Sequence, residues 1–171
     1  MQEEWLNSRG AIVRFDRNAI EIRVLDTQEC PAMDFAILHA IVTVLKMLAA
    51  RVQQGFLQYN MLATHELAQI FQRCIKDGDL AIIDHREYLA LFGCSQPVTA
   101  KQMWKHLLPN PTPEQSLLLN QGPLARRILG QWNQAKDTQQ QHQIYRSLVD
   151  CLHEGTPFVR DAHADMLDRH L

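Results

Sequence analysis

Three charged side chains lie close together in the segment Ile12 to Asp26, IVRFDRNAIEIRVLD: Arg14, Glu21 and Arg23. A carboxylate such as Glu21 can bind Mg²⁺, a hard cation that prefers carboxylates together with phosphate oxygens. The guanidinium of Arg23 can hold a phosphoryl group through two parallel hydrogen bonds. These residue types could therefore form part of a site for chemistry that uses ATP and Mg²⁺.

A β-hairpin is the element that would hold these side chains together. Hydrophobic residues alternate with other residues on both sides of the turn-forming run Asp16 to Asn18, as expected for two strands with one apolar face each. If residues 17 and 18 form a two-residue turn, Arg14 lies opposite Glu21. The pattern predicts a hairpin over residues 11–26 whose polar face carries Arg14, Glu21 and Arg23.

The same charges have a simpler interpretation. Arg and Glu are common on exposed strands, and Arg14 and Glu21 can form a cross-strand ion pair on a solvated face. By composition alone this ion pair is the more common outcome, so the residues leave both interpretations open.

Everything after Asp26 is expected to be helical. Pro31 suits the first position of a long helix that ends near Gly55, and this helix is apolar nearly all round, so it must be covered on most sides. Helix start and stop signals predict further helices: Thr64 to Asp77, Arg86 to Phe92 with Asp84 as the cap, Thr99 to Leu107, a helix after Thr112 broken or kinked at Gly122-Pro123, Asp137 to His153, and a last one from Thr156.

The expected fold is α+β and predominantly helical, in a single domain over residues 1–171. An N-terminal β-hairpin packs on the long buried helix, and a helical array completes residues 31–171. Because 46% of the 171 residues are hydrophobic and 21% are charged, the composition is that of an ordinary globular protein.

Charge and hydropathy exclude several classes of partner. A formal net charge of −2 provides no basic surface for nucleic acid. The most apolar stretch, Ala32 to Ala50, contains Asp34 and Lys46, which are costly inside a bilayer, so we expect a buried helix and no membrane. The first ten residues lack an apolar export signal, which makes the cytoplasm the expected location.

Cysteine and histidine residues suggest little further chemistry. No two of Cys30, Cys74, Cys94 and Cys151 have a metal-binding or redox spacing, so all four are expected to be reduced thiols. His39 is expected to be hydrogen-bonded in the core, and a general base is the alternative. Three further polar residues are expected in a solvated tail, with a metal pair as the alternative: His163, Asp165 and His170.

A hairpin alone leaves both of its outer edges without a partner strand, and an isolated two-stranded ribbon is marginally stable. We expect the missing strands to come from a second copy of the chain or from sequence N-terminal to Met1.

The stretch RFDRNAIEIRVLDTQECPAMDFAI resembles a region of bacterial glutamate-cysteine ligase family 2 proteins, the carboxylate-amine ligases. In that region an E-x-R strand leads through an acidic residue into a long helix. The runs GPLARRIL (Gly122 to Leu129) and LVDCLHEGTPF (Leu148 to Phe158) are similar in style to the C-terminal helical part of such proteins. The resemblance implies the C-terminal portion of a glutamine-synthetase-like ligase fold.

The resemblance also implies an activity and site residues. Such ligases use MgATP to convert the γ-carboxylate of glutamate into an acyl phosphate, and the amine of cysteine then displaces the phosphate. Glu21 would be a metal ligand, Arg23 a catalytic contact to phosphate or substrate, and Arg14 a further substrate or phosphate contact.

The chain departs from the family in one respect: the N-terminal half, which supplies other metal carboxylates and most of the sheet, has no counterpart here. Hence this chain is expected to be inactive alone and to need that half, or a second copy, to act on an amino-acid substrate. The alternative is a non-catalytic helical interaction domain whose hairpin completes a sheet in a dimer or in a partner chain.

Overall fold

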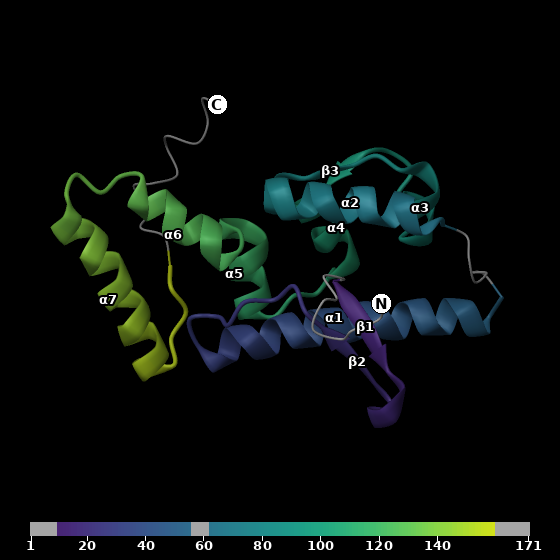
Figure 1. Cartoon of the computed structure of the whole chain (residues 1–171), viewed down its shortest axis with the longest axis horizontal. Coiled ribbons are helices and arrows are strands. Elements are labelled where there is room, and N and C mark those ends of the chain that lie inside the picture. Colours follow the sequence, from purple (N-terminus) through teal and green to yellow (C-terminus); the bar gives the residue numbers. More distant parts are fainter. Residues whose placement is uncertain (1–9, 56–61, 160–171) are drawn as a thin grey trace, which may run out of the picture.

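The computed structural model describes residues 10–55 and 62–159, and the fold is predominantly helical with a small hairpin. One long helix, α1 (Pro31–Gln53), runs beside two groups of shorter helices (Figure 1). The coarse α+β, mainly helical prediction is therefore confirmed.

The hairpin consists of β1 (Ala11–Arg14) and β2 (Ala19–Ile22), joined by the short 3₁₀ turn η2 (Phe15–Arg17). The predicted two-residue turn is wrong, because Arg14 pairs with Ala19 and Glu21 pairs with Ile12. A two-residue type I′ turn needs positive φ at both central residues, whereas here only Asn18 is left-handed, with φ 48°. The register shifts by two residues, so each side chain keeps its predicted face.

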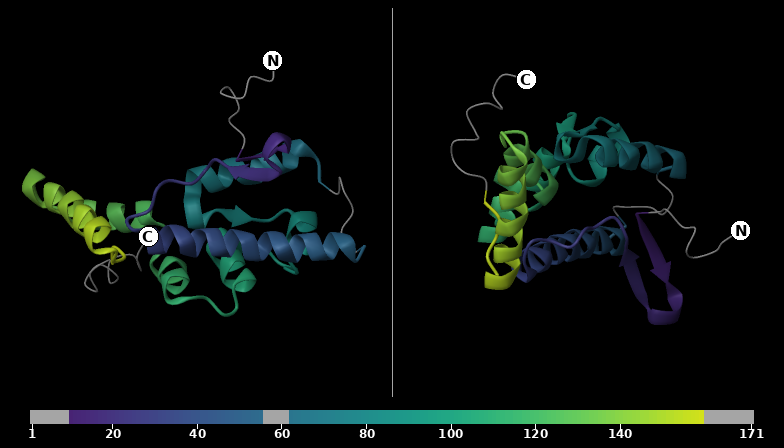
Figure 2. Two further views of the ribbon diagram at one scale, coloured as in Figure 1. Left: turned by 90° about the horizontal axis from the view of Figure 1, so that it is seen from below. Right: turned by 60° about the vertical axis from the view of Figure 1, so that its left-hand side comes forward.

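Helix α1 forms where it was predicted, with Pro31 in its first turn and Gln54 as its C-terminal cap. Within the described residues, the prediction that it is covered on most sides is wrong. Its buried residues are small or lie on one side, namely Met33, Ala36 and Ala40. Phe35 is 68% exposed and Leu38 is 54% exposed. The reason is that the neighbouring helices and the hairpin do not enclose it, as the two further views in Figure 2 show.

The remaining elements form the two groups of helices beside α1. Their bounds are α2 (Thr64–Asp77), η3 (Gly78–Leu80), β3 (Ile82–Ile83), α3 (Arg86–Leu91), β4 (Val98–Thr99), α4 (Ala100–Leu107), α5 (Pro113–Gln121), α6 (Leu124–Trp132) and α7 (Thr138–Glu154). Strands β3 and β4 pair antiparallel over two residues each. This ladder was not predicted, because two residues are too few to show a period of two.

Helix caps explain most of the boundaries. Thr99, Thr112 and Asp137 each accept a hydrogen bond from the backbone N–H three residues on, as predicted. The predicted cap Asp84 is wrong: the His85 ring caps α3 through Nδ1, and Asp84 instead accepts a hydrogen bond from Arg73 at 2.7 Å.

The last predicted helix is also wrong over the residues that can be compared. The segment Thr156–Val159 is irregular, because Phe158 is tied by its backbone N–H to the carboxylate of Glu29 at 3.0 Å. The rest of that predicted helix lies outside the described residues.

A hydrophobic core joins the middle of the chain to the second half of α1. Its buried members come from α2, β3, α3 with its C-terminal cap, and α4: Ile70, Ile83, Leu89, Phe92 and Met103. Val44, Met47 and Leu48 of α1 pack against this cluster. The core therefore lies on one side of α1 and leaves the hairpin outside it.

Candidate functional site

The polar face of the hairpin brings together all three predicted site residues. Glu21 accepts a hydrogen bond from Arg14 Nη1 through Oε2 at 3.0 Å, and a second from Arg23 Nε through Oε1 at 2.8 Å. The three side chains are partly buried, with exposed fractions of 18% for Arg14, 38% for Glu21 and 24% for Arg23. The carboxylate thus lies between two guanidinium groups and fixes their positions.

Because the register is shifted by two residues, Arg14 and Glu21 are not directly opposite each other on the two strands. Their side chains nevertheless form a hydrogen bond. Because Arg14 and Glu21 are diagonal neighbours on one face, a long side chain is needed to join them. Arg14 also contacts Asp16 in the turn, with 3.4 Å between Nε and Oδ1. The ion pair between Arg14 and Glu21 that the sequence suggested is therefore present.

The two arginines also determine the charge state of Glu21. Partial desolvation alone would raise the pKa of its carboxyl, but the hydrogen bonds and positive charges of Arg14 and Arg23 outweigh it, so the pKa lies below its ordinary value. Glu21 is consequently an anion at neutral pH.

This arrangement fits an anionic ligand better than it fits a complete magnesium site. Both carboxylate oxygens of Glu21 already accept hydrogen bonds from guanidinium groups. Over residues 10–55 and 62–159 there is no group of three or more His, Cys, Asp or Glu residues that could hold a metal ion. A phosphate or carboxylate could bind the arginines by sharing or displacing the Glu21 carboxylate, whereas Mg²⁺ would need ligands from elsewhere.

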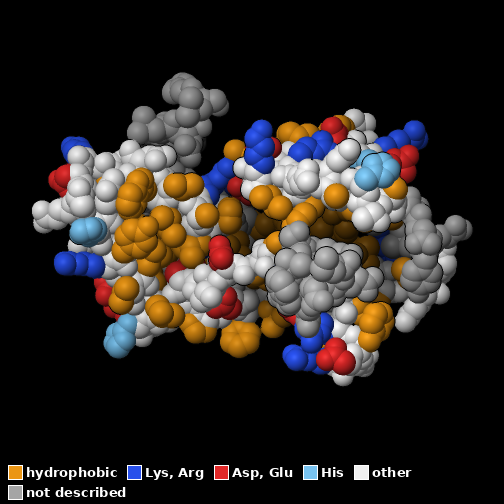
Figure 3. Space-filling view, in the orientation of Figure 1, with side chains coloured by type: hydrophobic (Ala, Val, Ile, Leu, Met, Phe, Trp, Pro, Cys, Tyr) orange, Lys and Arg blue, Asp and Glu red, His pale blue; other side chains and the backbone are white. Residues whose placement is uncertain are grey.

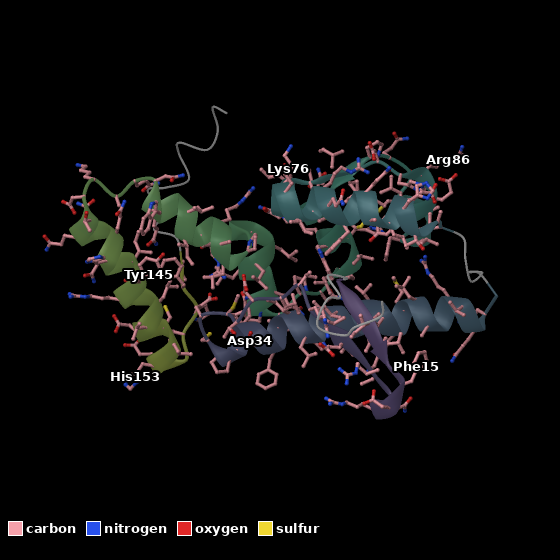
Figure 4. All side chains as sticks on the ribbon, in the orientation of Figure 1. Phe15, Asp34, Lys76, Arg86, Tyr145 and His153 are labelled. Carbon is pink, nitrogen blue, oxygen red and sulfur yellow. The ribbon has the colours of Figure 1, made fainter. Side chains whose placement is uncertain are left out.

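The opposite, apolar face of the hairpin borders a hollow of about 280 Å³ between β2 and α1. Its lining is mainly aliphatic: Ile20, Ile22, Leu25, Ile37, Leu38 and Ile41, with Asp26 and Asp34. At the tip of the hairpin Phe15 is 89% exposed, and Figure 4 shows it away from the helices. The apolar face is therefore only half covered by the residues that the structure describes.

Sequence reasoning did not find a buried ion pair formed by Glu29, just before the start of α1. Arg127 of α6 donates through Nη1 to Glu29 Oε1 at 2.5 Å, and both side chains are fully buried. The same Nη1 group donates to the carbonyl of Phe158. The partners are 98 residues apart, so no local pattern could have indicated the pair, which ties the segment before α1 to α6 and the segment after α7.

The other candidates carry no site. His39 is exposed rather than in the core, although its Nδ1 does contact Gln115 Nε2 at 3.2 Å. All four cysteines are free thiols, as predicted. His163, Asp165 and His170 lie outside the described residues.

Helix α1 is long and apolar enough to cross a membrane by length and composition alone. This is weak evidence, because the core helix of a soluble protein passes the same test. Within the described residues only 17% of an apolar 18-residue window of this helix is buried, so these residues do not enclose it.

Comparisons with known proteins find similarity over a short stretch of the chain only. No protein-family model matches the chain, and no solved structure matches it significantly. An uncharacterized protein from Archaeoglobus fulgidus is 51% identical over 43 residues, a stretch that is 25% of this chain and 12% of that relative. The chain thus spans a small part of the length of the curated relative that it matches, and its likeness to that protein carries no activity.

Proposed function

We propose that this chain is the C-terminal portion of an ATP-dependent carboxylate-amine ligase of the glutamate-cysteine ligase type. The observation that carries the proposal is the position of Glu21 between Arg14 and Arg23 on one face of the hairpin. Two arginines held by a carboxylate suit the binding of a phosphoryl group. The resemblance of the E-x-R strand to that ligase family supplies the reaction class.

In this proposal each residue has a distinct role. Arg23 binds the phosphoryl group or substrate carboxylate at the reacting end, and Arg14 provides a second contact to phosphate or substrate. Glu21 positions both guanidinium groups and serves as one Mg²⁺ ligand when the remaining ligands come from the rest of the enzyme. Bound MgATP would supply the phosphoryl group that activates a substrate carboxylate.

Exposed apolar residues on the hairpin and on α1 support the proposal that this chain is part of a larger protein. Val13 and Ile20 on the apolar face of the hairpin are 55% and 54% exposed, and Phe35 of α1 is 68% exposed. Val13 and Ile20 are paired across the two strands, and exposed apolar groups gathered in this way mark a surface that another chain or domain covers. We propose that the N-terminal half of the ligase, with its additional strands, covers it in the cytoplasm, and that neither nucleic acid nor a membrane is a partner.

Calorimetry with MgATP tests this proposal on two polypeptides: the chain alone and a longer one that includes the sequence encoded upstream of Met1. We expect binding by the longer polypeptide and weak or no binding by the chain alone. In the longer polypeptide, Arg23→Gln and Glu21→Gln should each weaken binding at least about tenfold, because one charge-assisted contact contributes about 1.5–3 kcal/mol.

Arg17→Gln is the matched control, since Arg17 is also on the hairpin but is 69% exposed, and its ion pair among the described residues is with Asp16 at 3.5 Å. It should leave nucleotide binding unchanged. If the longer polypeptide ignores MgATP, or binds it equally well with Glu21→Gln, this role for the hairpin is refuted.

The two-stranded sheet of the hairpin favours a second candidate function. Over the described residues β1 and β2 pair only with each other, so an outer edge could complete a sheet in a second copy or a partner chain. We propose this non-catalytic interaction domain as the alternative. Changing Arg14, Glu21 and Arg23 together to Gln would then alter stability only, whereas the ligase proposal expects loss of nucleotide binding by the longer polypeptide.

A further inference from the structure

Helix α7 has a second apolar surface that none of the described residues covers. Ile144 is buried against the rest of the molecule, which accounts for one face of the helix. On the adjacent outer face Tyr145 is 54%, Val149 65% and Leu152 59% exposed. These three positions are spaced four and three residues apart, so they form one stripe along the helix. We call Tyr145, Val149 and Leu152 the outer stripe.

The outer stripe belongs to a wider apolar patch. Figure 3 shows hydrophobic side chains gathered over α6 and α7, and Figure 4 shows Tyr145 on this side of α7. The Tyr145 ring packs edge-on against Trp132 of α6, with 5.8 Å between ring centroids. A half-exposed aromatic ring that is already held in place is a typical anchor of a protein interface.

Two opposite charges lie beside the outer stripe. Arg146 and Asp150, one helical turn apart, line a shallow hollow together with Tyr145 and Val149. Within the part of the chain that the structure describes, neither forms an ion pair. The stripe is thus flanked by one cation and one anion at a separation of four residues.

The outer stripe with Arg146 and Asp150 can pair with the same surface of a second copy of the chain. When two copies of a helix pair antiparallel about a two-fold axis, the same flank of each helix lies on the same side of the pair. If the axis passes near residue 148, Arg146 of one copy lies level with Asp150 of the other, and the reverse contact is identical. Tyr145 of each copy then lies near Leu152 of the other.

We propose that α7 is the interface of a homodimer in which two copies of this chain pair antiparallel through the outer stripe. The exposed aliphatic groups supply the apolar centre, and two symmetric Arg146–Asp150 contacts fix the register. One helix face is small beside the roughly 1,200–2,000 Å² that stable interfaces bury, so the dimer forms with a marked dependence on concentration. This inference is independent of the ligase proposal, which concerns the hairpin beside the first half of α1.

Charge exchange tests the dimer without disturbing its apolar centre. The experiment is sedimentation of the full chain over a range of micromolar concentrations, with wild type, Arg146→Asp, Asp150→Arg, and an equimolar mixture of the two variants. Each variant alone faces like charges at both symmetric contacts, so its dissociation constant should rise at least about tenfold. In the mixture, a copy with carboxylates at both positions meets a copy with guanidinium groups at both. Both contacts then join opposite charges again, so dimers should return as heterodimers.

Lys136→Asp is the control: it makes the same change of charge as Arg146→Asp at an exposed position before the helix. It should leave the dimer unchanged. Circular dichroism of each variant checks that α7 still folds, because Arg146 and Asp150 also lie four residues apart within one helix. Recovery in the mixture cannot come from that intrahelical pair.

Three results would overturn the proposal. The wild-type chain could remain monomeric at every concentration, or it could dimerise equally well with either variant. The mixture could also behave as the sum of its two components. Dimerisation that survives both variants but is lost on changing the hairpin would assign the interface to the hairpin edge instead.

Discussion

Replacing Arg127 by Met is expected to destabilise the protein more than any change at its surface. The guanidinium of Arg127 and the carboxylate of Glu29 are both fully buried, 2.5 Å apart. Met preserves most of the apolar length of the side chain but removes the positive charge. Glu29 then stays buried with one neutral donor, the N–H of Phe158 at 3.0 Å.

The size of the effect follows from that uncompensated charge. Removing one partner of a buried ion pair costs about 3–5 kcal/mol, against a typical total stability of about 5–15 kcal/mol. With a urea dependence of about 2 kcal/mol per molar, the midpoint of unfolding should fall by about 2 M.

Removing both charges should cost less than the two single changes together. In the double variant Glu29→Met with Arg127→Met no charge is left buried, and only the backbone groups of Phe158 lose their partners. The pair is also incompletely satisfied within the described residues, since Glu29 Oε2 and Arg127 Nε and Nη2 have no hydrogen-bond partner. We therefore expect a coupling of about 2 kcal/mol or more between the two positions.

The assay is urea unfolding followed by far-ultraviolet circular dichroism. Arg17→Met, at an exposed position of the hairpin, is the control and should change stability by less than about 0.5 kcal/mol. Arg127→Lys keeps the charge and guards against a variant that does not fold. The reasoning is refuted if Arg127→Met costs less than about 1 kcal/mol, or if the double variant costs the sum of the single ones.

Two further predictions concern a helix cap and the hairpin charges. Thr112→Ala removes the hydroxyl that accepts a hydrogen bond from the N–H of Gln115 at 3.2 Å. The free energy of unfolding should fall by about 1 kcal/mol, and the melting temperature by about 2–4 °C. Thr138→Ala, one residue past a cap, is the control, and an equal loss of stability in both variants would contradict the role of the cap. Because the pKa of Glu21 is lowered in the folded state, its contribution to stability is present above its ordinary pKa and is lost as the pH falls through the folded value. Melting temperatures measured from neutral to acidic pH should therefore fall more for wild type than for Glu21→Gln, and parallel curves would show that the two arginines do not stabilise the carboxylate.

Local chemistry determined most of the helices before any tertiary contact was known. The starts at Thr99, Thr112 and Asp137 were predicted because a cap and the backbone group that it binds lie within three residues of each other. The faces of the hairpin were predicted for a related reason: side chains alternate along a strand, so a register error of two residues left Glu21 on the correct face.

The tertiary structure decided what distant segments do to one another. The pairing of Glu29 with Arg127 joins residues 98 positions apart, and the cap of α3 passed from Asp84 to His85 because Arg73 of α2 binds Asp84. The exposure of α1 is of the same kind. Its sequence determined a helix that is apolar nearly all round, but the number of sides that are covered depends on which segments pack beside it. The hydrophobic pattern of a helix indicates which side chains favour burial. Whether they are buried depends on the segments that pack against the helix.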